Sequence, residues 1–233
     1  MNLEETKLHL KEKGYCSFEL KDFDESLCKY IEKYKSSTEL SRKENYTSLR
    51  ADFTGDYWTK IYGNINTDMG SFEAANNRKE EILAEIGNAN KNMFQIWLFC
   101  SLSDNNIKKI YDKITKYFFD LEDSEELSIE LSSTLYNDKC FLHDHIDGKS
   151  PVKNYASILI YLNENWNEED GGNLILRGDD KIDYKVVPEF GRVAIIDLQN
   201  FDIYHQVEQV VNDVERYTII CFPFDKKNLA KND

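Results

Sequence analysis

Eight short runs rich in β-branched and aromatic residues fill the chain from about residue 126 onward, and this pattern most constrains the fold. Turn signals such as Asn137-Asp138 and Gly171-Gly172 separate the runs. The runs cover residues 127–136, 139–146, 154–163, 173–177, 183–188, 192–197, 203–210 and 214–223. So many short strands after helical segments predict an α+β fold, a double-stranded β-helix (jelly-roll) barrel with supporting N-terminal helices.

The first half of the chain has helical periodicity. We expect helices over residues of about 3–12, after a cap at Asp22 or Asp24, over 76–88, and from Ser103-Asp104 onward. Their apolar stripes predict packing against a sheet. The apolar run 93–102 fits either a buried strand or a core helix segment, which periodicity does not separate.

Residues 37–75 mix polar and aromatic residues without a clear period. They fit either a long surface loop or a lid that covers a substrate. Arg50, Tyr57 and Trp58 are the candidate substrate contacts in such a lid, and Arg177, near the expected barrel mouth, is another. Because no low-complexity linker divides the chain, we expect one domain over residues 1–233. In it, residues 1–125 form the mainly helical support with the candidate lid, and residues 126–224 form the jelly-roll core.

Composition excludes several classes of protein. The 233 residues carry a formal net charge of −14, which argues against binding to a nucleic-acid backbone. No apolar run approaches the roughly 18 residues of a membrane span, and no signal-peptide pattern opens the chain. The five cysteines have scattered spacing, which predicts reduced thiols and a cytoplasmic protein. The sequence does not indicate an oligomeric state.

A His-x-Asp pair with a distant histidine is the strongest chemical signal. In a strand, His145 and Asp147 point to the same side and can bind one metal ion. His205 is the remaining candidate ligand, because His9 lies in a charged, helix-like stretch without a neighbouring ligand. Two imidazoles and one carboxylate form the facial triad of non-haem iron(II) sites, which leaves coordination positions open for substrate and oxygen.

Two residues near this triad need separate interpretation. Arg216 follows His205 beyond the turn signal Asn212-Asp213, and we expect runs 203–210 and 214–223 to pair as a hairpin. Thr218 shares a strand face with Arg216, whose guanidinium fits a carboxylate bidentately. His143 lies two residues before His145, so in a strand both side chains point to the same side. A cupin-like His143-x-His145 metal pair is therefore an alternative. No glutamate follows at the spacing a cupin needs, and we interpret His143 as a residue of the pocket wall.

With these residues in place, residues of about 127–224 resemble the catalytic core of the 2-oxoglutarate- and iron(II)-dependent oxygenases, in the prolyl 4-hydroxylase-like branch. The resemblance covers a little under half of the chain. The segments that carry it are Phe141-Leu142-His143-Asp144-His145-Ile146-Asp147, Ser157-Ile158-Leu159-Ile160-Tyr161-Leu162-Asn163, Asp170-Gly171-Gly172-Asn173-Leu174, Val187-Pro188-Glu189-Phe190-Gly191-Arg192 and Arg216-Tyr217-Thr218. Their order and spacing are far more specific than the triad alone.

The resemblance implies a role for each matching position. His145, Asp147 and His205 would bind Fe(II). Arg216 would pair with the distal carboxylate of 2-oxoglutarate, helped by Thr218, and Tyr161 and Tyr136 fall at co-substrate positions of the family. The spacing from His205 to Arg216 is slightly long for the branch, which leaves the register of the predicted hairpin open. The implied co-reactants are 2-oxoglutarate and O2, with ascorbate as a candidate reductant.

Asp147 also discriminates between reactions, because related halogenases have a small residue at that position. Its presence implies hydroxylation of an unactivated carbon, coupled to decarboxylation of 2-oxoglutarate to succinate. The branch favours a prolyl residue in a protein or peptide as substrate. The alternatives are a hydroxylase of a free amino acid or another small molecule, and a non-catalytic 2-oxoglutarate-binding sensor on the same fold.

Overall fold

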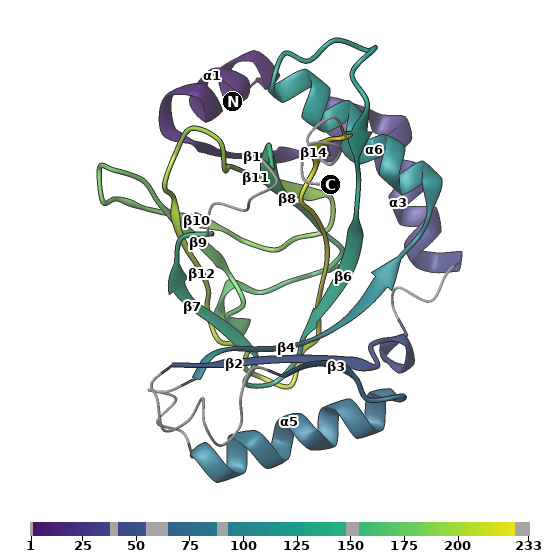
Figure 1. The fold of residues 1–233 in the computed structure, drawn as a ribbon, viewed down its shortest axis with the longest axis vertical. Coiled ribbons are helices and arrows are strands. Elements are labelled where there is room, and N and C mark those ends of the chain that lie inside the picture. Colours follow the sequence, from purple (N-terminus) through teal and green to yellow (C-terminus); the bar gives the residue numbers. More distant parts are fainter. Residues whose placement is uncertain (1, 38–41, 55–64, 88–92, 148–153, 227–233) are drawn as a thin grey trace.

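The computed structural model describes residues 2–37, 42–54, 65–87, 93–147 and 154–226 (Figure 1). Its helical elements are α1 (Leu3–Lys13), α2 (Leu20–Phe23), α3 (Glu25–Ser37), η2 (Lys43–Asn45), α5 (Phe72–Ile86), α6 (Asn105–Phe118) and η3 (Glu168–Asp170). Its first strands are β1 (Tyr15–Glu19), β2 (Ser48–Phe53), β3 (Ile65–Asp68), β4 (Met93–Leu102), β5 (Leu127–Ser128), β6 (Leu131–Tyr136) and β7 (Phe141–His145). The others are β8 (Ala156–Tyr161), β9 (Leu174–Arg177), β10 (Asp183–Val186), β11 (Arg192–Asp197), β12 (Tyr204–Val207), β13 (Arg216–Cys221) and β14 (Phe224–Asp225).

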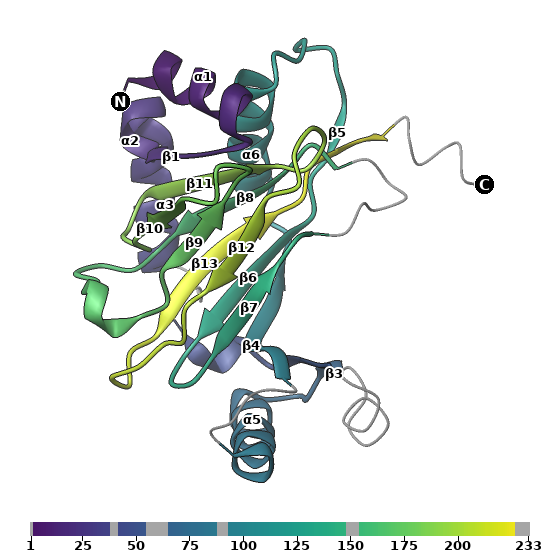
Figure 2. The same ribbon diagram turned by 90° about the vertical axis from the view of Figure 1, so that its left-hand side faces the viewer.

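The strands form a nearly closed antiparallel barrel, as the sequence predicts. One wall follows the order β1-β11-β8-β13-β6 and the other the order β7-β12-β9-β10. Strand β4 joins the walls, because its first half pairs with β7 and its second half with β6. On its other edge, β4 pairs with β2, which in turn pairs with β3 (Figure 2). The fold is therefore α+β, with a jelly-roll barrel and supporting helices.

Alternation along each strand of the first wall separates two cores. On β13, Tyr217 and Ile219 face the helices, whereas Arg216 and Ile220 face the barrel interior. The same alternation divides β8, β6 and β11, so each strand is buried on both faces. This explains why β8 is buried along its whole length. Only the β8 side chains that face the barrel interior can contribute to a functional site there.

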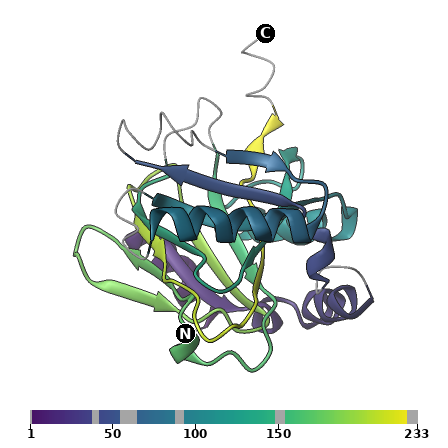
Figure 3. The ribbon, with the colours of Figure 1, turned by 90° about the horizontal axis from the view of Figure 1, so that it is seen from below.

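The helices cover the outer face of this wall and the outside of β2. Helix α6 begins at its cap Asp104, whose carboxylate accepts from the backbone N–H groups of Asn106 and Ile107. Its buried stripe includes Ile110 and Ile114, which pack in the core shared with the first wall. Helix α5 instead lies along β2 and β4 at the other end of the molecule (Figures 1 and 3). Within the described residues, no helix is long and apolar enough to cross a membrane.

One expectation needs correction, and the structure decides two points that the sequence left open. Strands β12 and β13 do not form a hairpin, because β12 pairs with β7 and β9 whereas β13 pairs with β6 and β8. The turn at Asn212 and Asp213 does form, with positive φ at both residues, but it connects opposite walls of the barrel. The interval 37–75 is not one long loop, because β2 and β3 lie in it. Residues 93–102 form strand β4 and not a helix.

Candidate active site

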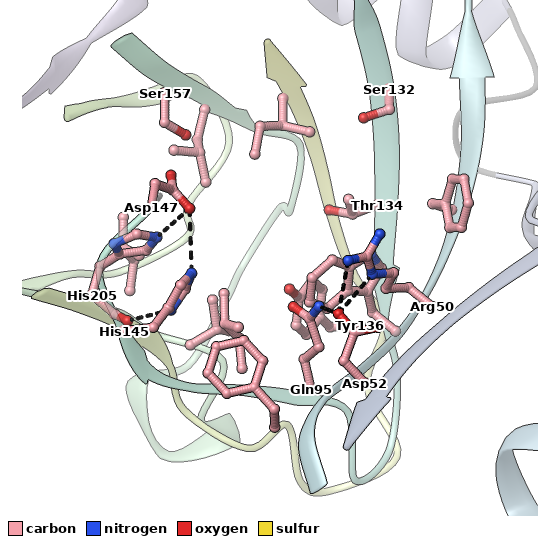
Figure 4. Close-up of a pocket in the computed structure, with 18 of the residues that line it drawn as sticks. Arg50, Asp52, Gln95, Ser132, Thr134, Tyr136, His145, Asp147, Ser157 and His205 are labelled. Atoms are coloured by element: carbon pink, nitrogen blue, oxygen red, sulfur yellow. Dashed lines mark hydrogen bonds and ion pairs between the residues drawn. The ribbon is translucent and has the colours of Figure 1, made fainter. Parts of the chain in front are cut away.

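His145, Asp147 and His205 lie together on the second wall of the barrel. His145 ends β7 and pairs across the ladder with His205 on β12, so the two imidazole rings are 4.1 Å apart between centroids. Asp147 Oδ1 lies 3.3 Å from His145 Nε2 and 3.7 Å from His205 Nε2. One ligand atom from each residue falls within 4.8 Å of the others. Two nitrogens and one oxygen therefore face a common point, as Figure 4 shows.

The second nitrogen of each imidazole determines which nitrogen can bind a metal. His145 Nδ1 lies 3.0 Å from the carbonyl oxygen of His143 and 3.1 Å from that of His205. His205 Nδ1 lies 3.2 Å from the carbonyl oxygen of Ile203. Because a carbonyl oxygen only accepts, each Nδ1 carries the proton and each Nε2 keeps a lone pair directed at the common point.

Burial and charge move the three pKa values in different directions. Burial lowers the pKa of His205, which favours its neutral, ligating form. Burial also lowers the pKa of His145, but the hydrogen bond and charge of Asp147 outweigh it and leave that pKa raised. Burial raises the pKa of Asp147, yet the two histidines outweigh this and lower it, so Asp147 is a carboxylate at neutral pH. The donor set thus suits a borderline divalent ion such as Fe(II).

Arg216 on β13 is only 1% exposed and enters the barrel from the first wall. Its guanidinium carbon lies 4.9 Å from the ring centroid of Tyr136 and 5.0 Å from that of Tyr161. Nη1 donates to Thr218 Oγ1 at 3.1 Å, whereas Nε and Nη2, on one edge of the guanidinium, have no partner among the described residues. A buried cation with two free N–H donors is costly unless an anion meets it. That edge fits a carboxylate bidentately.

Tyr161 adds a further unpaired donor beside the two of Arg216. Its side chain is fully buried, and its hydroxyl has no hydrogen-bond partner in the part of the chain that the structure describes. Burial raises the pKa of Tyr161 to about 12, so the phenol keeps its proton. Tyr136 stacks on Trp97 at 5.4 Å between ring centroids. The residues present therefore fit both a metal ion and an anionic co-substrate.

A cavity of about 470 Å³ connects these groups. It reaches from the His145, Asp147 and His205 cluster to Arg216 and Tyr136. Thr218 and Tyr161 do not line it, and they contact Arg216 from behind. Strand β4 contributes the aromatic lining of the cavity, with Phe94 edge-on to the His145 ring at 5.0 Å between centroids, and with Trp97 and Phe99.

Sequence reasoning missed one part of this cavity. Arg50 was a candidate contact and does line the cavity, but Asp52 and Gln95 line it beside Arg50. Asp52 Oδ2 accepts from Arg50 Nε at 2.9 Å, lies 2.8 Å from Arg50 Nη2 and accepts from Gln95 Nε2 (Figure 4). The spacing Arg50-x-Asp52 places both side chains on one face of a strand, so recognising β2 as a strand would have shown the pair.

Two of the other candidates lie elsewhere. His143 is exposed and does not line the cavity, because a β-bulge in β7 breaks the alternation. His205 pairs with His145 and Val207 with Leu142, so both β7 residues face inward and His143 faces outward. Arg177 also lies outside the cavity, in ion pairs of 2.8 Å with Asp144 and 2.6 Å with Asp183.

Tyr57 and Trp58, the remaining contacts of the expected lid, lie outside the described residues.

Comparisons with known proteins agree with this geometry. The family profile described as "2OG-Fe(II) oxygenase superfamily" matches residues 131–223, which contain the three candidate metal ligands and Arg216. No curated protein matches the sequence.

Solved structures share the fold at low sequence identity. A prolyl hydroxylase of Trichoplax adhaerens, solved with a hypoxia-inducible-factor peptide fragment, has a TM-score of 0.61 and 16% identity, covering 99% of this chain and 92% of that one. A prolyl-4-hydroxylase of Pseudomonas putida has a TM-score of 0.53 and 15% identity, covering 97% and 100%. At such identities the likeness shows the fold alone. Residues 131–223 thus match the 2-oxoglutarate- and iron(II)-dependent oxygenase superfamily over the strands that carry the site, which indicates a dioxygenase that uses Fe(II), 2-oxoglutarate and O2.

Proposed function

We propose that the protein is a hydroxylase in which His145, Asp147 and His205 hold Fe(II) and Arg216 holds 2-oxoglutarate. One observation carries the proposal. Arg216, whose buried Nε and Nη2 have no partner among the described residues, lines the same cavity as the three converging ligand atoms. A metal site alone would not need a buried guanidinium, and an anion site alone would not need two imidazoles with their Nε2 atoms directed at one carboxylate oxygen.

The chain's own residues position the reactants and keep them dry. Iron and 2-oxoglutarate supply the oxidising chemistry that inserts oxygen into a C–H bond and leaves succinate and CO2. Arg216 would donate to the distal carboxylate, held in place by the Tyr161 ring and by Thr218, while the Tyr136 ring would exclude water around it. Asp147 would provide a carboxylate ligand to the metal, which supports hydroxylation over halogen transfer.

For the substrate we propose a prolyl residue in a protein or peptide. The aromatic wall of Phe94, Trp97 and Phe99 offers an apolar face for a pyrrolidine ring. The two prolyl hydroxylases described above have the same fold, and one was solved with a peptide. A free amino acid or another small molecule is the second candidate, since a cavity of about 470 Å³ also fits a small substrate.

Oxygen-dependent succinate formation from 2-oxoglutarate tests the reaction. We expect His145→Ala and Asp147→Ala to abolish both succinate and metal binding. His143→Ala is the matched histidine control, and we expect it to keep both because His143 lies outside the cavity. Metal binding that survives Asp147→Ala but is lost in His143→Ala would favour the cupin-like alternative instead.

The non-catalytic sensor makes a different prediction. It would bind 2-oxoglutarate tightly, yet form no succinate with any member of a substrate panel. A purified, iron-loaded protein that binds neither metal nor 2-oxoglutarate would contradict both readings of the site.

A further inference from the structure

The Arg50, Asp52 and Gln95 cluster has no role in holding iron or 2-oxoglutarate, yet it lines the same cavity. Asp52 and Gln95 are 8% and 6% exposed, and they are cross-strand partners on β2 and β4. Figure 4 shows the cluster across the cavity from the histidines. Side chains buried to this degree on neighbouring strands form a rigid wall, which is what a recognition site needs.

Only one of the two carboxylate oxygens of Asp52 accepts hydrogen bonds within the cluster. Three donors, Arg50 Nε, Arg50 Nη2 and Gln95 Nε2, converge on Asp52 Oδ2. Asp52 Oδ1 is buried and has no hydrogen-bond partner in the part of the chain that the structure describes. A buried carboxylate oxygen without a donor is costly, and the Asp χ2 torsion is broad enough to turn it toward the cavity. Asp52, whose side chain lines the cavity, therefore lacks one N–H donor among the described residues.

The charges of the residues that line the cavity indicate which kind of substrate group can supply that N–H donor. On the metal side, the two charges of Fe(II) balance the two carboxylates of 2-oxoglutarate, and Asp147 balances Arg216. On the other side, Arg50 and Asp52 balance each other. Among the described lining residues, no charged side chain is left to compensate a charged substrate group. An uncharged group that both donates and accepts fits this wall best.

A main-chain amide has this chemistry. Its N–H matches Asp52 Oδ1, and its C=O matches Arg50 Nη1, the guanidinium nitrogen that the pair with Asp52 does not use. We propose that Arg50, Asp52 and Gln95 are specificity-determining residues that bind a main-chain amide of the substrate. They would thereby select a residue within a peptide over a free amino acid. This inference rests on the proposed function and assigns its substrate class.

A binding experiment tests the inference without turnover. The protein is loaded with Mn(II) and a non-reactive 2-oxoglutarate analogue, and it is offered a library of proline-centred peptides with acetylated and amidated ends, together with free L-proline. We expect capped peptides to be retained over L-proline. Replacing one amide N–H of the best peptide by an ester oxygen should weaken binding about tenfold or more, since a hydrogen bond to a charged acceptor is lost.

Variants then assign that hydrogen bond to Asp52. Asp52→Asn leaves Arg50 without a counter-charge, so the preference should shift by about tenfold or more from capped peptides toward ligands with a free carboxylate. The double variant Arg50→Gln/Asp52→Asn removes this surplus charge, and the gain for carboxylates should disappear. In Asp52→Asn, the ester and amide peptides should bind alike, which a merely structural role of Asp52 would not produce.

The control is Glu19→Gln, which removes the carboxylate of another Arg–acid pair, Arg192 to Glu19 at 2.7 Å, outside the cavity. The inference is overturned if L-proline is retained over every capped peptide, if the ester substitution has no effect, or if Asp52→Asn shifts the preference no more than Glu19→Gln. Each of these outcomes counts against the inference only if the protein binds Mn(II) and the 2-oxoglutarate analogue. Failure to bind them would instead overturn the proposed function.

Discussion

At the scale of single residues, the site depends on buried polar groups that the described residues of the chain leave incompletely paired. Arg216 and Tyr161 were singled out by resemblance to a family, and within the described residues Arg216 Nε and Nη2 and the Tyr161 hydroxyl have no hydrogen-bond partner. His143 shows the limit of reasoning from single residues. Its spacing from His145 predicts that both side chains point the same way, but the bulge in β7 turns His143 outward.

Arg216→Met should separate binding from stability. Without the guanidinium, 2-oxoglutarate affinity should fall by about tenfold to a hundredfold, as charge-assisted hydrogen bonds are lost. The thermal midpoint of the metal-free protein should not fall and should rise slightly, since a buried unpaired cation is replaced by a packed apolar chain. Calorimetric titration and thermal melting measure the two effects. Loss of stability equal to that of a core truncation would contradict this.

The affinity for a metal should decrease as pH falls. A bound metal displaces the proton from His145, whose pKa is raised above its ordinary value of 6.5. Below that raised pKa, Mn(II) affinity should fall by about tenfold per pH unit, with proton uptake when the metal leaves. The lowered pKa of Asp147 keeps the carboxylate ionised through this range, so it adds no second step. Titrations from about pH 8 to about pH 6 test this, and an affinity constant across that range would be the contrary result.

At the scale of elements, the connections between strands position the side chains of the site. Gly171 and Gly172 follow η3 with φ of +70° and +63°, where other residues are strained. A Cβ on Gly172 would lie 2.9 Å from Arg216 Cδ and 3.1 Å from the Trp166 ring. This glycine pair, which the sequence marks only as a turn, is thus part of the surface that holds Arg216.

Gly172→Ala should weaken 2-oxoglutarate binding although it removes no functional group. The added methyl must displace the Arg216 side chain, and the positive φ costs about 1–2 kcal/mol of stability. Gly87→Ala is the matched control, because it also has positive φ, +73°, but its Cβ meets nothing within 4 Å. Both variants should lose similar thermal stability, and only Gly172→Ala should lose affinity. Equal affinities in the two variants would show that Gly172 does not position Arg216.

At the scale of the whole molecule, two apolar cores stabilise the barrel without a metal. The outer core joins α1, α3 and α6 to the first wall, and the inner core fills the barrel beside the cavity. In the described part of the chain the five cysteines are free, so no disulfide contributes. The fold therefore does not require a bound ion, unlike small metal-stabilised domains.

Chelated protein should remain folded and bind ligands as a preformed site. Its far-ultraviolet circular dichroism should match that of the loaded protein. A metal at about a hundred times its dissociation constant should add about 2.7 kcal/mol of stability, and 2-oxoglutarate at the same excess should add about as much again. Melting curves with chelator, metal and both ligands measure this. Unfolding on chelation alone would contradict a metal-independent core.

The sequence by itself determined what depends on neighbours along the chain: the α6 stripe, the cap at Asp104, the shared face of Arg216 and Thr218 on β13, and the His145-x-Asp147 pair. These follow from local periodicity, which a linear pattern records directly. Only the tertiary structure decided which strands pair, so it placed β12 and β13 in opposite walls, made β2 a strand against β4, and brought Asp52 and Gln95 together. Such contacts join residues far apart in the chain, and their free energy depends on burial and register that no local window contains.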